Sequence, residues 1–134
     1  MKKAIWAAVL AAIVSIFAIS CSKSSMNSSK LVGSWKLVST TVTSGSYSET
    51  EIETSNIVVN FVKGGTLTLT TTSGSKTLTV AGTWNVVDDA LYIIVDDDAY
   101  SYIITEINNK SMILSRTKTI SGEIYTYSEN YTKL

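Results

Sequence analysis

From residue 31 to the C-terminus, apolar and polar side chains alternate with a period of two. That period is typical of β-strands with one face on a core, whereas an amphipathic helix repeats every 3.6 residues. The longest clean alternation runs through Leu78, Val80, Gly82, Trp84 and Val86. The pattern predicts strands over residues 35–42, 47–54, 57–62, 66–70, 78–86, 91–95, 100–107, 112–116 and 123–131.

Short polar turns, such as Lys63-Gly64-Gly65 and Ser73-Gly74-Ser75, separate these strands. Such short connections join antiparallel neighbours. An open meander of this length leaves bare strand edges, and closure into a barrel removes them. The sequence therefore predicts an all-β domain over residues 31–134, folded as a small antiparallel up-and-down barrel of about eight to ten strands. No helix is expected after residue 20.

Two similar segments carry large aromatic side chains, LVGSWKLV at 31–38 and VAGTWNVV at 80–87. Gly33 lies two positions before Trp35, and Gly82 lies two positions before Trp84, so each pair shares one face of a strand. The glycine leaves room for the indole where the sheet bends. We expect both indoles to plug one barrel. The likeness has two open explanations: an internal duplication, or a barrel whose two ends each need a Gly–Trp corner.

The N-terminus has the pattern of an export signal over residues 1–20. Lys2 and Lys3 precede an apolar run over residues 4–18, which is shorter than the roughly 20 residues of a spanning helix. Cys21 follows, and residues 21–30 are rich in Ser and poor in apolar side chains. This composition predicts a flexible tether between the signal and the barrel.

Composition excludes several classes of function. Without the two N-terminal lysines, nine basic residues face eleven acidic ones, so the domain has no basic patch for nucleic acid. The chain has no His, which excludes Ser-His-Asp catalysis and His metal ligands. Cys21 is the one cysteine, so no intramolecular disulfide forms. We expect no enzyme activity, no catalytic residues, no metal and no cofactor.

The carboxylates fit structural roles. Glu49, Glu51 and Glu53 share one strand face, at a spacing that a paired-carboxylate glycosidase allows. A charged, solvated edge is the favoured interpretation, because nothing near them in sequence raises one carboxyl pKa. Asp96-Asp97-Asp98 lacks the spaced ligands of a calcium loop and is interpreted as a turn.

Tyrosines are the candidates for ligand binding. Tyr100, Tyr102, Tyr125 and Tyr127 lie on late strands, and rings with hydroxyls suit flat, partly polar ligands. The alternative is that these tyrosines are ordinary strand residues, which are often half exposed.

Two resemblances add to this picture. Ala18-Ile19-Ser20-Cys21 resembles the lipobox of bacterial lipoproteins, which implies acylation of Cys21 and cleavage before it. The segments Gly33-Ser34-Trp35, Gly82-Thr83-Trp84 and 112–116 are similar to the lipocalin-like lipoproteins of Bacteroidota. In lipocalins an Arg on a late strand stacks on the first-strand Trp. The resemblance therefore implies that Arg116, the single Arg of the chain, covers Trp35.

The resulting expectation is a lipid-anchored, monomeric protein of the cell envelope. Its acylated Cys21 would hold it on the outer membrane, more on the periplasmic face than on the surface. The barrel would bind a small apolar or aromatic ligand. The alternative is an interaction or inhibitor module with a filled barrel and no small ligand.

Overall fold

A computed structural model describes residues 26–134 of the protein; the expected signal, Cys21 and the first residues of the expected tether lie outside them. Within this part, the chain forms a short helix over residues 26–31 and then nine strands. The strands are β1 (Gly33–Ser44), β2 (Tyr47–Ile52), β3 (Asn56–Val62), β4 (Thr66–Ser73), β5 (Lys76–Val87), β6 (Ala90–Val95), β7 (Asp98–Ile107), β8 (Ser111–Ile120) and β9 (Glu123–Lys133). Residues 26–134 contain no helix long and apolar enough to span a membrane.

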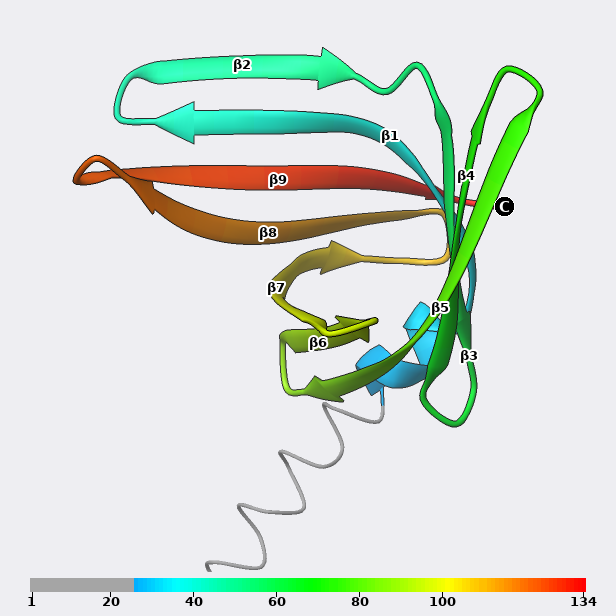
Figure 1. The fold of residues 1–134 in the computed structure, drawn as a ribbon. Helices are drawn as coiled ribbons and strands as arrows, with labels where there is room; N and C mark the ends of the chain where they lie inside the picture. Colours follow the sequence, from blue (N-terminus) through cyan, green and yellow to red (C-terminus); the bar gives the residue numbers. More distant parts are fainter. Residues whose placement is uncertain (1–25) are drawn as a thin grey trace, which may run out of the picture.

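The strands form a closed antiparallel barrel of eight strands with one extra strand (Figure 1). Pairing of β1 with β9 closes the ring. On its other side, β1 pairs with β3 along its first half and with β2 along its second half, so β2 is the extra strand. The predicted all-β barrel is confirmed, and each predicted strand corresponds to one observed strand.

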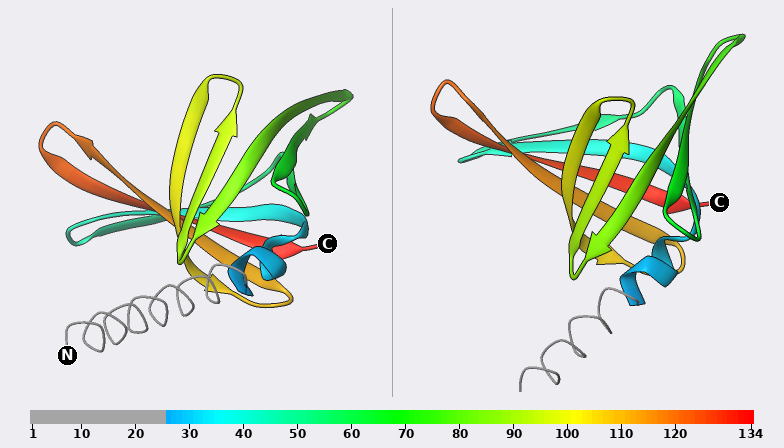
Figure 2. Two further views of the ribbon diagram at one scale, coloured as in Figure 1. Left: turned by 90° about the horizontal axis from the view of Figure 1, so that it is seen from below. Right: turned by 60° about the horizontal axis from the view of Figure 1, so that its bottom comes forward.

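One end of the barrel is closed and plugged. The turns after β3, β5 and β7 gather there, and the helix lies against it (Figure 2). Leu31 at the end of the helix is fully buried, and its carbonyl accepts a hydrogen bond of 2.8 Å from Trp35 Nε1. Asn27 Nδ2 donates to the Asp88 carbonyl over 2.7 Å. Two expectations are therefore corrected, namely a tether through residue 30 and no helix after residue 20. Burial of Leu31 in the core stabilises the helical turn that precedes it.

Both predicted Gly–Trp pairs lie near this closed end. Trp35 is fully buried, and Trp84 packs edge-to-face on Phe61 with ring centroids 5.5 Å apart. A Cβ on Gly82 would lie 2.3 Å from the Ile94 carbonyl oxygen, so the adjacent strand approaches too closely for any side chain. Gly33 has a φ of 129°, which L side chains rarely adopt.

The two Trp segments do not occupy opposite ends of the barrel, as one explanation of their likeness required. Trp84 Nε1 donates to the carbonyls of Val62 and Thr66, which flank the β3–β4 turn at the closed end. β1 runs away from the closed end, and β2 and β3 both run back toward it. β4 then runs away again, so β5 runs toward the closed end. The two segments therefore lie at one end, on strands of opposite direction.

The expected stacking of Arg116 on Trp35 is wrong. Lys133 Nζ lies 5.3 Å from the Trp35 ring centroid and takes that place. The Arg116 guanidinium lies instead 5.3 Å from the ring centroid of Tyr127, its register partner on β9. Arg116 pairs with Tyr127, far from the start of β1 and toward the open end. Lys133, in contrast, is the direct cross-strand partner of Trp35.

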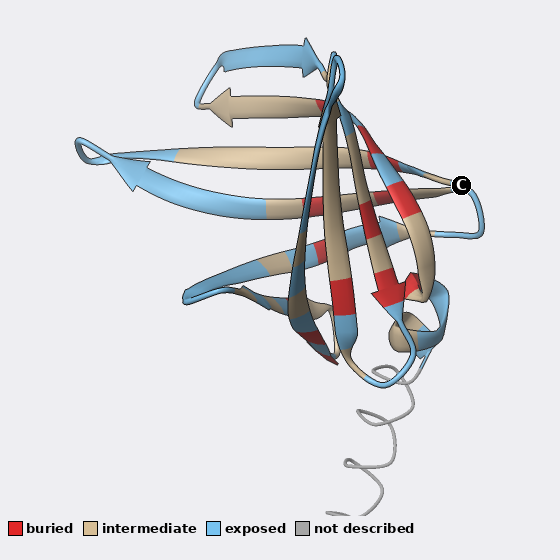
Figure 3. Cartoon of the chain, turned by 45° about the vertical axis from the view of Figure 1, so that its right-hand side comes forward, coloured by how far each residue is buried: buried red, intermediate tan, exposed pale blue. Residues whose placement is uncertain are grey.

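The other end of the barrel is open, and its hairpins splay apart (Figure 2). Pairing of β7 with β8 begins only at Ile103 and Ser115, so the rest of β8 pairs with β9 alone. The β1–β2 and β8–β9 hairpins continue past the barrel as one ribbon, held by the β1–β9 pairing. Buried residues concentrate in the barrel body, and the hairpin tips are exposed (Figure 3).

Candidate ligand-binding site

The barrel interior contains a cavity of about 220 Å³ between the plugged end and the open end. Nine apolar side chains from β1, β3, β4, β6 and β8 form most of its wall, and they include Leu37, Phe61, Leu67, Leu69 and Leu114. These residues face inward because each is an alternate position of a strand whose other face meets solvent. Four polar residues complete the wall, namely Tyr100, Tyr102, Glu129 and Tyr131.

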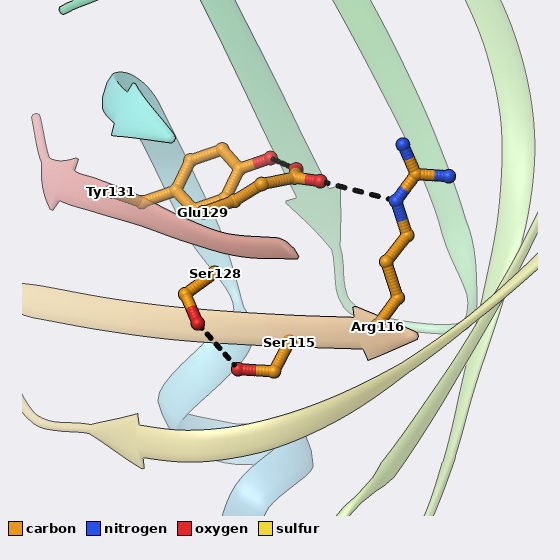
Figure 4. Close-up of polar contacts among 5 residues, drawn as sticks. All are labelled: Ser115, Arg116, Ser128, Glu129 and Tyr131. Carbon is orange, nitrogen blue, oxygen red and sulfur yellow. Dashed lines mark hydrogen bonds and ion pairs between the residues drawn. The ribbon is translucent and has the colours of Figure 1, made fainter. Parts of the chain in front are cut away.

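Glu129 is the charged residue of this wall among the residues that the structure describes, and its side chain is only 12% exposed. The Tyr131 hydroxyl donates a hydrogen bond of 2.6 Å to Glu129 Oε1. On the other side, Arg116 Nε lies 3.8 Å from Glu129 Oε2 (Figure 4). Arg116 is 43% exposed, so the cation lies toward solvent and the carboxylate lies toward the cavity.

Two tyrosines of the cavity wall, Tyr102 and Tyr131, keep their protons far into the alkaline range. Burial, and then the negative charge of Glu129, raises the pKa of Tyr102 to about 12. Burial is also the main cause that raises the pKa of Tyr131 well above 10, and the charge of Glu129 adds to it. Both phenols are therefore hydrogen-bond donors at neutral pH.

The structure brings two of the four predicted ligand-binding tyrosines to the cavity, Tyr100 and Tyr102. The other two, Tyr125 and Tyr127, do not line this cavity. They lie on the first part of β9, next to the hairpin tip, where β8 has no β7 partner. Their shared face is therefore outside the closed ring. Tyr127 packs under Arg116, and the Tyr125 hydroxyl donates to Glu123 over 3.2 Å.

Sequence reasoning missed Glu129 and Tyr131 as site residues. The alternation of β9 places Tyr125, Tyr127, Glu129 and Tyr131 on one face. A carboxylate in an inward-facing series is a recognisable signal of a polar site. The carboxylates at 49, 51 and 53 lie away from the cavity, and no group of acidic or Cys side chains within residues 26–134 could hold a metal ion.

Comparison with known proteins identifies the fold family. A family model described as a lipocalin-like domain matches residues 31–114, which is more than half of the chain. The protein belongs to the lipocalin-like domain family. No curated protein matches the chain significantly.

Solved structures agree with this lipocalin-like fold. A lipocalin-like protein from Bacteroides uniformis superposes with a TM-score of 0.60 at 15% identity, covering 78% of this chain and 99% of the other. Lobster apocrustacyanin A1 superposes with a TM-score of 0.56 at 15% identity, covering 84% of this chain and 66% of the other. At such low identities, the shared property is the fold.

Proposed function

We propose that this lipocalin-like domain binds one small, mostly apolar molecule in its barrel, without catalysing a reaction. The supporting observation is the cavity of about 220 Å³, with a wall of aliphatic and aromatic side chains and a polar patch at Glu129. Ligand sites have this composition, an apolar lining with a few convergent polar groups. The alternative of a filled barrel has less support, because only the closed half of the interior is filled.

The cavity has room for about one ring. Drug-sized ligands occupy pockets of roughly 300–1,000 Å³. An apolar cavity of about 150 Å³ holds benzene. The cavity of about 220 Å³ therefore suits a substituted benzene or a short branched chain.

The proposal includes a lipid anchor at Cys21 and a place on the periplasmic face of the outer membrane, as a monomer. The lipobox-like residues before Cys21 support this part. The helix over residues 26–31 docks on the closed end of the barrel, and five residue steps from Cys21 reach at most about 18 Å. An anchored protein would hold its closed end toward the membrane and direct the cavity mouth away from it.

The anchor is tested with Cys21→Ala in the full chain. Loss of the thiol removes the acylation site, so the variant should be released from membranes or keep its signal unprocessed. Fractionation with salt and carbonate washes, followed by mass measurement of the chain, shows which occurs. A variant that is cleaved and still remains wholly with the washed membranes would refute the anchor.

Ligand binding is tested by methyl NMR on the full mature chain in lipid nanodiscs. Benzyl alcohol should shift the methyl signals of Ile93, which lines the cavity, and leave those of Ile124 on the β8–β9 hairpin unchanged. Leu69→Trp, which fills the cavity, is the matched control and should abolish the Ile93 shift. Equal shifts at Ile93 and Ile124, or in both proteins, would indicate partition into the lipid and contradict the proposal.

A further inference from the structure

We infer that the Glu129–Arg116 pair makes the cavity selective for ligands whose polar end is uncharged and carries a hydroxyl. This inference rests on the proposed function, because it names the ligand class of the same cavity. The pair balances one negative charge at the cavity wall with one positive charge beside it, one inward-facing position closer to the open end on β8. The charge of the pair, more than the apolar wall, then decides which polar ends are accepted.

Glu129 retains an acceptor site for a ligand. Its Oε1 accepts the Tyr131 hydroxyl at 2.6 Å, and its Oε2 lies 3.8 Å from Arg116 Nε. That second separation gives electrostatic attraction but exceeds the usual hydrogen-bond length. A carboxylate has about four lone-pair sites. Oε2 is therefore open to a donor from the cavity side.

A charged ligand end would upset the balance of the pair. A carboxylate inside the cavity is repelled by Glu129, which lines the wall, whereas Arg116 is not one of the lining residues. An ammonium group gains from Glu129, but it must compete with a guanidinium already in place and lose its own hydration. Arg116 is also held in position by its packing over Tyr127. An uncharged donor avoids both costs.

Tyr102 supplies the complementary group. Its side chain lines the same wall as Glu129, and burial, followed by the negative charge of Glu129, raises the pKa of its hydroxyl. A protonated phenol donates one hydrogen bond and accepts others. A ligand hydroxyl between these side chains would donate to Glu129 and accept from Tyr102. This pairing favours an alcohol or a phenol over an ether or a ketone.

The test uses four probes that share one ring and differ in one group: toluene, benzyl alcohol, benzoate and benzylamine. Each is titrated at neutral pH into the mature chain in nanodiscs, with the Ile93 methyl shift as the readout. Benzyl alcohol should bind about ten-fold more tightly than toluene, the effect expected of one hydrogen bond to a charged acceptor. Benzoate and benzylamine should bind more weakly than toluene.

Two variants turn the preference in opposite directions. Glu129→Gln leaves Arg116 without its counter-charge, so benzoate should overtake benzyl alcohol. Arg116→Gln leaves the Glu129 carboxylate without its counter-charge, so benzylamine should bind more tightly than benzyl alcohol. Lys118→Gln is the matched control, since Lys118 lies on the same strand as Arg116 but opposite Tyr125, away from the cavity, and it should leave the ranking unchanged.

The outcomes separate this inference from the function on which it rests. Probes that bind with no advantage for the hydroxyl, or rankings that stay fixed in Glu129→Gln and Arg116→Gln, overturn the role of the pair while the cavity remains a binding site. If no probe shifts Ile93 in any of the proteins, the proposed function itself fails. The unliganded methyl spectrum of each variant shows that its fold is intact.

Discussion

The two ends of the barrel differ in what their side chains do. At the closed end, Leu31, Trp35 and Leu91 are fully buried. At the open end, Leu78 and Ile124 are 66% and 64% exposed although both are apolar. The contrast indicates that the closed end supplies the stability of the fold. The open half, with the cavity and the splayed hairpins, contributes less to that stability and is the half to which the proposed function assigns ligand binding.

Hydrogen bonding follows the same division. Both indole N–H groups at the closed end donate to backbone carbonyls, and main-chain bonds from Lys133 to Lys110 and from Leu134 to Ser34 tie the last strand to its neighbours. At the open end, the side-chain bonds include exposed hydroxyl pairs, such as Thr41 with Thr50, and exposed tyrosine–carboxylate bonds, such as Tyr125 with Glu123. Bonds that remain in contact with water contribute little net stability.

The comparison is tested most strongly by Trp35→Ala. The change removes a fully buried indole and its hydrogen bond to Leu31, and large-to-small changes of this kind cost about 3–5 kcal/mol. Tyr47→Ala at the open end, where the ring is 52% exposed, should change the free energy of unfolding by less than about 0.5 kcal/mol. Urea unfolding measures both. Similar losses in the two variants would remove the distinction between the ends.

A smaller effect is expected for Gly82→Ala. The new Cβ would lie 2.3 Å from the Ile94 carbonyl oxygen and 2.9 Å from Val95 Cγ2, so β5 and β6 must separate. Overpacking of this kind costs about 1–3 kcal/mol. Thr83→Ala, the adjacent exposed position, is the control and should stay within about 0.5 kcal/mol of wild type. A Gly82→Ala protein as stable as this control would show that the sheet yields there.

The strands could be predicted from the sequence because alternation is a local property. Leu78 to Val86 alternate as β5 does, and glycine turns such as Gly64-Gly65 mark where strands end. The helix over residues 26–31 could not be predicted, because its one buried anchor, Leu31, stands in the apolar start of the next segment. Composition alone then makes the preceding serines look like a tether.

The site was predicted less completely, because it depends on register between strands far apart in sequence. Arg116 and Lys133 are both late cations, and only the pairing of β1 with β9 places Lys133 on Trp35. Likewise, Tyr125 and Tyr127 share a face with Tyr131, but they lie on the first part of β9, before the strand enters the closed ring. Periodicity gives the face of a residue, whereas its height along the barrel follows from register.

The smallest expected effect concerns the open half alone, and it appears in the urea midpoint only at alkaline pH. Tyr102 has its pKa raised to about 12 in the folded protein, above its ordinary value of 10, so the stability it contributes is complete below pH 10 and is lost as pH rises toward 12. Tyr102→Phe cannot ionise, so its urea midpoint should fall less than that of wild type between pH 10 and 12. Parallel losses in the two proteins would mean that the alkaline sensitivity arises elsewhere, and that ionisation at the cavity wall does not loosen the open half.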